Sequence, residues 1–268
     1  MTGHEPSAEI DTSKPHPARM YDWFLGGKDN YPVDEQMARQ LLAVDARGRD
    51  MARVNRAFMH RATRWLAENG IRQFLDIGAG IPTEPNLHQV AQRTAPDARI
   101  VYCDNDPIVL AHAAALLCST PEGATEYIQA DARRPEVILE AAGKVLDFDR
   151  PIALSLLALL HFLDDEDGAA ELVDRLVDQL APGSYLVLSQ TTGDFDPEGA
   201  AQAAAMYRAR GMTLRPRSRA ELTAFFGGLE LVDPGVSLSA DWHPELGEVV
   251  DVLGDEPIPG YAGVARKV

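Results

Sequence analysis

The sequence predicts an α/β fold in which helices cover both faces of a largely parallel β-sheet. From residue 71 onward, short apolar runs alternate with stretches of helical periodicity, which is the order of strands and helices in repeated βαβ units. Runs such as IALSLL, at residues 152–157, are apolar on both faces of a strand, as in a sheet buried between two helical layers. Together these observations indicate a doubly wound sheet.

Helices are expected before the sheet. Residues 1–17 are rich in polar residues and proline and are expected to form a disordered tail. Residues 18–70 are expected to form a helical extension or lid, and residues 71–268 the ligand-binding domain. Between residues 33 and 69 the pattern is helical, and it ends at the dipeptide NG, a typical helix C-terminus.

Strands and helices are expected to alternate within the sheet domain. The expected strands are 71–77, 99–103, 124–129, 152–157, 184–189, 229–232 and 260–266. The expected helices are 86–93, 107–117, 135–142 and 165–180. Ser218 and Glu221 form a capping box that opens one more helix, which ends at the two glycines 227–228.

The residues after the first expected strand favour a bound ligand. In a doubly wound sheet the ligand lies beyond the C-terminal ends of the strands, at the point where the strand order reverses. There the sequence places Asp76, Gly78, Ala79 and Gly80. Glycines at this position let the backbone approach a ligand closely and turn sharply into a helix. The alternative is a plain turn.

Acidic residues end the next two strands. Asp104 follows the second strand, where a carboxylate can accept hydrogen bonds from both ribose hydroxyls. Asp106 and Pro107 have the sequence of a helix N-cap and first helical residue. Asp131 follows the third strand, where a carboxylate can bind an adenine amino group; the alternative for each acid is a simple helix cap. Three acids disfavour a diphosphate, so an adenosine that carries a positive group fits better.

Composition excludes several classes of function. The chain of 268 residues has a formal charge of −16 and a pI near 4.8, which disfavours a nucleic-acid partner. Cys103 and Cys118 give neither a disulfide framework nor a metal-ligand spacing, and the acidic run 164–167 lacks His or Cys, so no metal is expected. The N-terminus has no apolar signal core, and the longest apolar run is shorter than the about 20 residues that span a bilayer. A cytoplasmic protein without a membrane partner is expected.

Several motifs resemble those of a known family. FLDIGAG, VYCDNDP and QADAR are similar to the motifs of class I S-adenosylmethionine-dependent methyltransferases. A closer resemblance is to the actinobacterial S-adenosyl methyltransferase family, formerly catalogued as a domain of unknown function. It extends from residue 17 to the C-terminus and rests on the segments ARMYDWFLGGKDNYPVDE, GIPTEPNLHQVAQ, DNDPIVLAHAAALL and ALLHFLDD. Among these, GGKDN is the most specific mark.

The resemblance implies a fold, a cofactor and part of its site. The implied fold is a Rossmann-like α/β fold whose seven-stranded, mostly parallel sheet has an antiparallel last strand and is preceded by helices. The implied cofactor is S-adenosylmethionine. Its methionine part is expected beside Asp76 and residues 78–80. Its ribose is expected on Asp104, and its adenine near Asn105, Asp131 and Ala132.

Pro82 departs from the general methyltransferase pattern. It stands where the superfamily often carries a third glycine. The closer family has the pattern G-x-P-T, which GIPT matches. A proline near the start of a helix loses no needed hydrogen bond, so we interpret Pro82 as a residue that stiffens the loop.

His161 is the candidate catalytic residue. Methyl transfer is an in-line displacement in which positioning supplies much of the catalysis, and an oxygen or nitrogen nucleophile also uses a base. His161 follows the fourth expected strand, within reach of a bound substrate. The alternative is that it only packs or caps beneath the site.

The segment 21–31, YDWFLGGKDNY, is a candidate lid. It combines aromatic residues, two glycines and polar tips, and an aromatic face near the sulfonium is favourable. Tyr21, Asp29 and Asn30 are its candidate cofactor-binding residues. The alternative is a turn whose aromatic residues pack on the core.

One face of the helix expected at 33–69 is basic. It carries Arg49, Arg53, Arg56, His60 and Arg64. A solvated face that offsets nearby acids is the favoured interpretation. Contact with the methionine carboxylate or with an acidic substrate is the alternative.

The sequence therefore predicts S-adenosylmethionine-dependent methyl transfer to a small molecule, since the acidic surface disfavours nucleic acid. The second possibility is an NAD(P)-dependent oxidoreductase on a related sheet. Against it, Thr83 stands where the dinucleotide fingerprint has its third glycine, and no tyrosine has a lysine four residues later. A third possibility is a non-catalytic S-adenosylmethionine-binding protein, which nothing in the sequence excludes.

Overall fold

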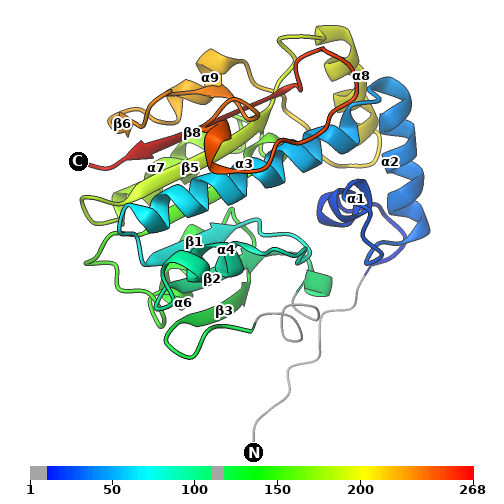
Figure 1. Cartoon of the computed structure of the whole chain (residues 1–268). Coiled ribbons are helices and arrows are strands. Elements are labelled where there is room, and N and C mark those ends of the chain that lie inside the picture. Colours follow the sequence, from blue (N-terminus) through cyan, green and yellow to red (C-terminus); the bar gives the residue numbers. More distant parts are fainter. Residues whose placement is uncertain (1–10, 110–117) are drawn as a thin grey trace, which may run out of the picture.

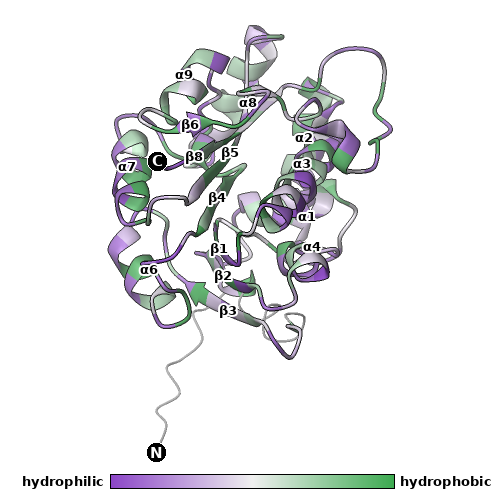
Figure 2. Ribbon diagram, turned by 60° about the vertical axis from the view of Figure 1, so that its left-hand side comes forward, coloured by the Kyte–Doolittle hydropathy of each residue, from purple (hydrophilic) through white to green (hydrophobic). Residues whose placement is uncertain are grey.

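A central β-sheet lies between two layers of helices (Figures 1 and 2). The structure is a computed structural model that describes residues 11–109 and 118–268. The strand order is β3-β2-β1-β4-β5-β8-β6, and β7 also pairs with β8. The strands are β1 Gln73–Ile77, β2 Arg99–Asp104, β3 Ala124–Gln129, β4 Ala153–Leu157, β5 Tyr185–Thr191, β6 Glu230–Leu231, β7 Ser237–Leu238 and β8 Gly260–Arg266.

The expected mostly parallel sheet with an antiparallel last strand is confirmed. Strands β1 to β5 pair in parallel, and β8 runs antiparallel to β5, β6 and β7. Within the described residues the sheet has eight strands rather than the seven expected. The added strand is β7, whose two residues are too few to show an alternating pattern in sequence. The strand order reverses between β1 and β4, so this is where a ligand site is expected.

Helices cover each face of the sheet with a separate core. The helices are α1 Pro17–Phe24, α2 Pro32–Val44, α3 Gly48–Glu68, α4 Leu87–Thr94, α6 Pro135–Ala142, α7 Ala169–Asp178, α8 Pro197–Arg208 and α9 Arg219–Ala224. One core joins the sheet to α6, α7 and α9 through Ile138, Leu176 and Leu222. The other joins it to α3 and α4 through Phe58 and Leu87. The sheet is therefore buried on both faces, as its apolar strands predict.

The helical pattern at 33–69 divides into two helices. Helix α2 ends at Val44 and α3 begins at Gly48. Between them the Asp45 carboxylate accepts hydrogen bonds from the backbone nitrogen and from Nε of Arg47, both at 2.9 Å. Such a side-chain-to-backbone bond competes with helix hydrogen bonding, which explains why the expected continuous helix is wrong here.

Helix α7 begins later than the expected residue 165. Gly168 has φ 81°, a left-handed conformation that interrupts the helix just before Ala169. The Asp165 carboxylate instead accepts a hydrogen bond from Nη2 of Arg217 at 2.7 Å and from Nη2 of Arg215 at 3.0 Å. The acid is committed to these arginines, which are distant in sequence, and does not begin the helix.

Two expected segments lie partly outside the described residues. Of the helix expected at 107–117, residues 107–109 are helical, and the Asp106 carboxylate accepts a hydrogen bond from the backbone nitrogen of Ile108 at 3.1 Å. Residues 110–117 lie outside the described part, as do residues 1–10 of the expected tail. The capping box of Ser218 and Glu221 at α9 is confirmed. Helices α1 and α8 were not among the expected elements.

No helix within residues 11–109 and 118–268 combines the length and apolar character needed to cross a bilayer.

Candidate functional site

A cavity of about 570 Å³ lies at the C-terminal ends of the parallel strands. Loops after β1 to β5 form one side, and α1, α2, α3 and α8 close the other, where Figure 1 shows α1 and α2 beyond the strand ends. The lining includes ten of the sequence-predicted site residues: Tyr21, Asp76, Gly78, Ala79, Gly80, Asp104, Asn105, Asp131, Ala132 and His161. Asp29 and Asn30 are not among the lining residues of the described chain.

The two glycines after β1 are required for different structural reasons. Gly78 has φ 79°, and a Cβ there would lie 2.8 Å from Cδ1 of Leu159. Gly80 has φ 67° with open space around it, so only its backbone conformation favours glycine. The backbone nitrogen of Gly78 donates to the carbonyl of Cys103 at 2.8 Å, which fixes this loop against the end of β2. Backbone is thereby brought to the cavity without a side chain in front of it.

Asp104 joins the first two strand ends. Its Oδ2 accepts a hydrogen bond from the backbone nitrogen of Gly80 at 2.8 Å, and its Oδ1 accepts one from that of Asp106 at 3.0 Å. Burial raises the pKa of the Asp104 carboxyl, which these backbone donors oppose. A carboxylate has about four acceptor positions, so two remain for hydroxyl groups of a ligand. The neighbouring Asn105 is exposed and lines the same part of the cavity.

Asp76 is a buried acid at the floor of the cavity. Burial raises its pKa to about 7, opposed by the positive charge of Arg56 and reinforced by the negative charge of Asp104. Arg56 itself donates to the backbone carbonyls of Thr83 and Pro85 rather than to the acid. A cationic ligand group beside Asp76 would favour its ionised form, so this end of the cavity suits a positive charge.

Asp131 already has a partner. Arg133 donates to both of its carboxylate oxygens, from Nε at 3.0 Å and from Nη2 at 2.7 Å, and these bonds lower the pKa of Asp131. Its side chain is about one third exposed. The pair lies at the rim with Ala132, where a ligand would meet an oriented carboxylate rather than an isolated one.

Tyr21 belongs to a hydrogen-bond chain that sequence reasoning missed. Its hydroxyl donates to the Ala52 carbonyl at 3.0 Å and accepts from Nδ2 of Asn55 at 2.9 Å. Oδ1 of Asn55 accepts from the Ser189 hydroxyl at 2.6 Å, and that hydroxyl accepts from the backbone nitrogen of Ala158 at 2.9 Å. The chain links α1 and α3 to the ends of β4 and β5. Tyr21, Asn55, Ser189 and Ala158 all line the cavity.

Ala158 has an uncommon backbone conformation. Its φ of 50° is left-handed, a conformation that is uncommon for residues other than glycine. Such residues occur more often at functional sites than elsewhere. It follows β4 directly, at the reversal of the strand order. No feature of the sequence indicated this conformation.

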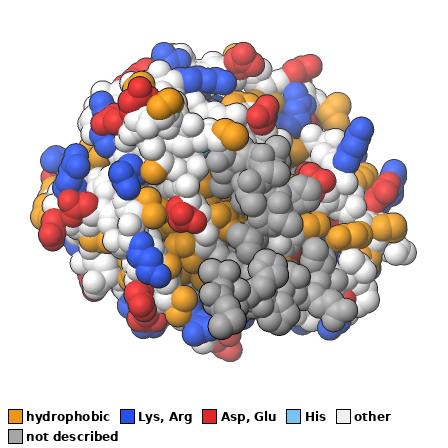
Figure 3. Space-filling model, turned by 90° about the horizontal axis from the view of Figure 1, so that it is seen from below, with side chains coloured by type: hydrophobic (Ala, Val, Ile, Leu, Met, Phe, Trp, Pro, Cys, Tyr) orange, Lys and Arg blue, Asp and Glu red, His pale blue; other side chains and the backbone are white. Residues whose placement is uncertain are grey.

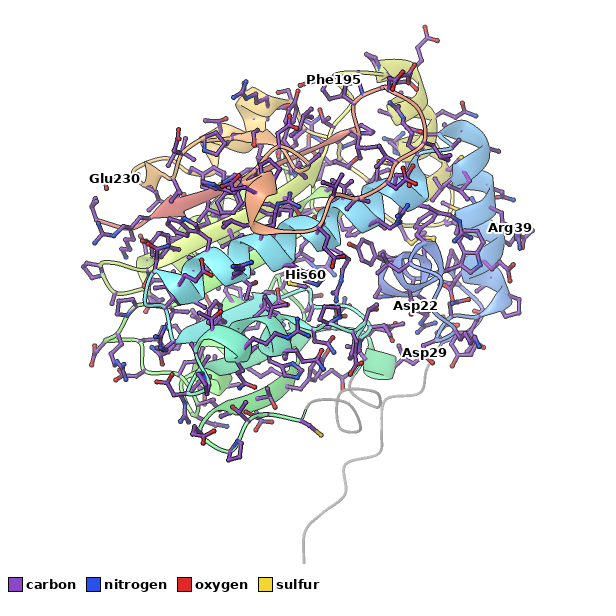
Figure 4. All side chains as sticks on the ribbon, in the orientation of Figure 1. Asp22, Asp29, Arg39, His60, Phe195 and Glu230 are labelled. Atoms are coloured by element: carbon purple, nitrogen blue, oxygen red, sulfur yellow. The ribbon has the colours of Figure 1, made fainter. Side chains whose placement is uncertain are left out.

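The GGKDN turn, residues 26–30, encloses Asp22 (Figure 4). Oδ2 of Asp22 accepts hydrogen bonds from the backbone nitrogen of Asp29 at 2.9 Å and from Nδ2 of Asn30 at 2.8 Å. A Cβ at Gly27 would collide with the same carboxylate. These contacts account for Gly27 and Asn30 by local structure, in line with the turn alternative. The cofactor-binding roles of Asp29 and Asn30 stay predictions.

A buried ion pair anchors α1 beside this loop. Arg19 donates to Asp106 from Nε to Oδ2 at 2.8 Å and from Nη2 to Oδ1 at 3.0 Å. Both side chains are almost completely buried. Nδ1 of His16 lies 3.2 Å from the same carboxylate. Sequence reasoning assigned Asp106 only to a helix cap; its larger role depends on a partner 87 residues away.

His161 is neutral and lacks an orienting partner. Burial, then the charge of Arg217, lowers its pKa to about 3. Its Nδ1 is buried without a hydrogen-bond partner among the described residues. A histidine that acts as a general base normally has its other ring nitrogen oriented by an acceptor. This geometry disfavours His161 as a general base, and its catalytic role stays a prediction.

The basic face of α3 binds loops rather than only facing water. Arg56 and Nε2 of His60 both contact the carbonyl of Pro85, at 2.8 and 2.9 Å. Arg53 donates to the carbonyl of Asp251 at 2.8 Å, and Arg64 to that of Leu246 at 3.3 Å. The stripe therefore fixes the loop after β1 and the loop before β8 to one helix. This differs from the expected solvated face because residues 83–85 and 246–251 contact this side of α3.

Comparison with known proteins identifies close relatives. The family model described as S-adenosyl methyltransferase matches residues 3–268. A crystal structure of a DUF574 family protein from Streptomyces avermitilis is 47% identical, with a TM-score of 0.92, over 97% of this chain and 100% of that one. A protein from Thermobifida fusca assigned as a methyltransferase is 40% identical, with a TM-score of 0.86, over 98% of each chain.

More distant structures share the fold alone. Human N-acetylserotonin methyltransferase, crystallised with S-adenosylmethionine, is 14% identical with a TM-score of 0.51, over 92% of this chain and 62% of that one. No curated protein matches the chain.

Proposed function

The chain belongs to the S-adenosyl methyltransferase family, and from this premise we propose that it methylates a small molecule bound in the cavity beside the cofactor. The observation that carries the proposal is the continuity of the cavity. One hollow extends from the strand-end loops at Asp76, Gly78 and Asp104 to the part lined by α1, α2 and α8. Cofactor and acceptor thus have adjoining places in one cavity.

The residues at the strand ends fit S-adenosylmethionine. Asp76, buried and with a raised pKa, suits the ammonium of the methionine part, while the glycine loop leaves room for its chain. Asp104 has acceptor positions for the ribose hydroxyls. Asn105, Asp131 and Ala132 are assigned to the adenine. Three carboxylates line this half of the cavity, and its two arginines are already bound, Arg56 to backbone carbonyls and Arg133 to Asp131. This balance favours a positively charged nucleoside over a dinucleotide.

When bound, S-adenosylmethionine would supply an activated methyl group to a lone pair of the acceptor. S-adenosylhomocysteine would leave with the electron pair of the broken S–C bond, and the proton released by the acceptor would pass to water. The chain's own residues position the reactants. The hydrogen-bond chain through Tyr21, Asn55 and Ser189 fixes the walls at the reversal of the strand order. His161, with its lowered pKa, is assigned to orient the acceptor as a neutral group rather than to hold its proton.

Calorimetric titration with S-adenosylmethionine, S-adenosylhomocysteine, NAD and NADP tests the cofactor half. Binding of the first two is expected, with a loss of about tenfold or more in Asp104→Ala because two hydrogen bonds to ribose disappear. Binding of a dinucleotide instead would support the oxidoreductase, which the family match disfavours. Transfer of a radiolabelled methyl group to small molecules of a cell extract tests turnover. Cofactor binding with no transfer in any extract would support the non-catalytic alternative.

The charge of the chain favours a small acceptor, and its cysteines favour a cytoplasmic location. The formal charge of −16 opposes binding to nucleic acid, and on the face in Figure 3 basic and acidic side chains are interspersed. We place the protein in the cytoplasm because its two cysteines form no disulfide and Cys103 is buried as a thiol. Cell fractionation followed by immunoblotting tests this placement.

A further inference from the structure

We propose that the methyl acceptor is an uncharged, largely apolar ring compound that binds in the chamber between α2–α3 and α8; this rests on the proposed function. The chamber is the part of the cavity farther from β1 to β3.

The first wall comes from the N-terminal helices. Phe24, Leu41, Val44 and Met51 all line the cavity and are only half-buried, so each leaves apolar surface uncovered. They come from α1, α2 and α3. Apolar surface kept open inside a hollow is typical of a ligand site, because a core side chain would otherwise be covered by its neighbours.

The second wall comes from the segment after β4 and from α8 with the residues that follow it. Phe162, Met212 and Leu214 are half-buried and line the cavity, together with the buried ring of Tyr207. The rings of Phe162 and Tyr207 lie 6.0 Å apart and are inclined by 32°. A flat apolar ring can pack beside such aromatic rings, and the methionines on both walls adapt to its outline.

The charged groups that line this chamber already have hydrogen-bond or ion-pair partners. Nη2 of Arg47 lies 2.9 Å from Oδ2 of Asp45, and Arg47 also contacts Glu256 at 3.3 Å. The Asp196 carboxylate accepts a hydrogen bond from the backbone nitrogen of Gly199 at 2.9 Å, as the cap of α8. An ionic acceptor would lose its hydration without gaining an opposite charge, which is unfavourable. An uncharged acceptor avoids that loss.

The floor of the chamber offers polar groups that are not ionised. Gln190, buried at the end of β5, donates from Nε2 to the carbonyl of Arg215 at 2.9 Å. Its Oε1 has no hydrogen-bond partner within the described chain. A hydroxyl or N–H of the acceptor is the group that would satisfy it. The acceptor is thus apolar over most of its surface, with a donor near the strand ends.

Three probes that share one ring system test the proposal: uncharged naphthol, anionic naphthoate and cationic naphthylmethylammonium. Each is titrated by calorimetry at neutral pH into the full chain saturated with S-adenosylhomocysteine. Naphthol is expected to bind about tenfold or more tighter than either ion. Met212→Asp is expected to weaken naphthol about tenfold or more, and Met212→Leu to keep it within about threefold, because only the first places a charge on the wall. Val249→Asp, at a side chain 92% exposed and outside the cavity lining, is the matched control and is expected to leave binding unchanged.

Titration of the nucleoside into each variant separates the possible failures. Tighter binding of either ion, or equal naphthol binding in Met212→Asp and in wild type, would overturn the acceptor class while S-adenosylhomocysteine still binds. No binding of the nucleoside to wild type would overturn the proposed function and the acceptor assignment with it. If Met212→Asp also fails to bind the nucleoside, the variant is misfolded and its naphthol binding is not informative. Met51→Asp, on the opposite wall, then replaces it in the same comparison of naphthol binding.

Discussion

At the scale of single residues, the site depends on groups that are unfavourable for the isolated protein. Burial disfavours the ionised form of Asp76. Ala158 has a left-handed backbone conformation, which is unfavourable for a residue with a Cβ atom. Gly78 avoids a collision that any other residue would meet. Such features gather where a ligand, rather than the fold, gains from them.

Asp76→Asn is expected to stabilise the ligand-free protein at high pH. The pKa of Asp76 is raised from 3.8 to about 7, so the folded state binds the proton more tightly than the unfolded state. The free energy of unfolding therefore falls as the pH rises from about 4 to about 7, and the full loss remains above about 7. Asparagine cannot ionise, so thermal unfolding at pH about 8 is expected to show a gain of about 1 to 3 kcal/mol. A variant less stable than wild type at that pH would contradict the raised pKa.

The same carboxyl makes ligand affinity depend on pH. The ammonium of S-adenosylhomocysteine prefers ionised Asp76, so wild-type affinity is expected to rise about threefold to tenfold between pH about 6 and about 8. Asp76→Asn is expected to bind weakly and without this rise. Asp131→Asn is the matched control. Arg133 lowers the pKa of Asp131, so this carboxyl stays ionised between these pH values. Calorimetry at the two pH values measures all three proteins.

Gly78→Ala is expected to destabilise the protein more than Gly80→Ala. Both glycines have positive φ, but only the Cβ at residue 78 meets Leu159. The expected losses are about 2 to 3 and about 1 kcal/mol, measured by urea unfolding. Adding Leu159→Ala to Gly78→Ala removes the collision and is expected to make the double variant less destabilised than the two single losses combined. Equal losses at the two glycines would show that backbone conformation alone matters.

At the scale of elements, α1 and α3 join the N-terminal helices to the sheet. Helix α1 is fixed by Arg19 to Asp106, two residues beyond Asp104. Helix α3 binds the loop after β1 through Arg56 and the loop before β8 through Arg53. Both helices are therefore fixed to loops that line the cavity. The lid role of residues 18–70 stays a prediction.

Arg19→Met is expected to loosen α1 and weaken cofactor binding together. Breaking a buried ion pair removes the arginine partner of Asp106 and leaves only His16 beside its charge, at a cost of about 3 kcal/mol. The resulting shift near Asp104 is expected to weaken S-adenosylhomocysteine about tenfold or more. Arg39→Met is the matched control, because Arg39 on α2 is 67% exposed in its side chain and pairs with Glu35 at the surface (Figure 4). Thermal unfolding and calorimetry of both variants measure the difference, and equal effects would remove the special role of the buried pair.

At the scale of the whole molecule, the cavity lies between the sheet domain and the N-terminal helices. Its lining residues come from segments between residue 15 and residue 260, so distant parts of the sequence meet at one site. A ligand that fills it contacts both parts and stabilises them together. Binding and global stability should therefore change in parallel.

S-adenosylhomocysteine is expected to raise the melting temperature of the wild-type protein. At a concentration about 100 times its Kd, a ligand that binds only the folded state adds about 2.7 kcal/mol, or about 5 to 10 °C for a domain of this size. Asp104→Ala is expected to show a much smaller shift at the same concentration. A wild-type melting temperature that does not respond would contradict binding in the enclosed cavity.

The sequence by itself predicted what local patterns determine. Apolar runs gave the strands at 124–129 and 260–266 with their observed bounds, and Pro135–Ala142 was likewise expected as a helix. Capping at Ser218 follows from residues three apart. The resemblance of FLDIGAG, VYCDNDP and QADAR led to the cavity residues at the strand ends. These elements depend on neighbours in sequence, so sequence is sufficient for them.

Only the tertiary structure decided the roles that depend on distant partners. Asp106 meets Arg19 across 87 residues, and Ser189 meets Asn55 across 134. The lowered pKa of His161 likewise comes from the residues that bury it and from the charge of Arg217. The physical reason is that burial and charge at a site are sums over everything packed around it. Periodicity and spacing describe one segment at a time and carry no record of those neighbours.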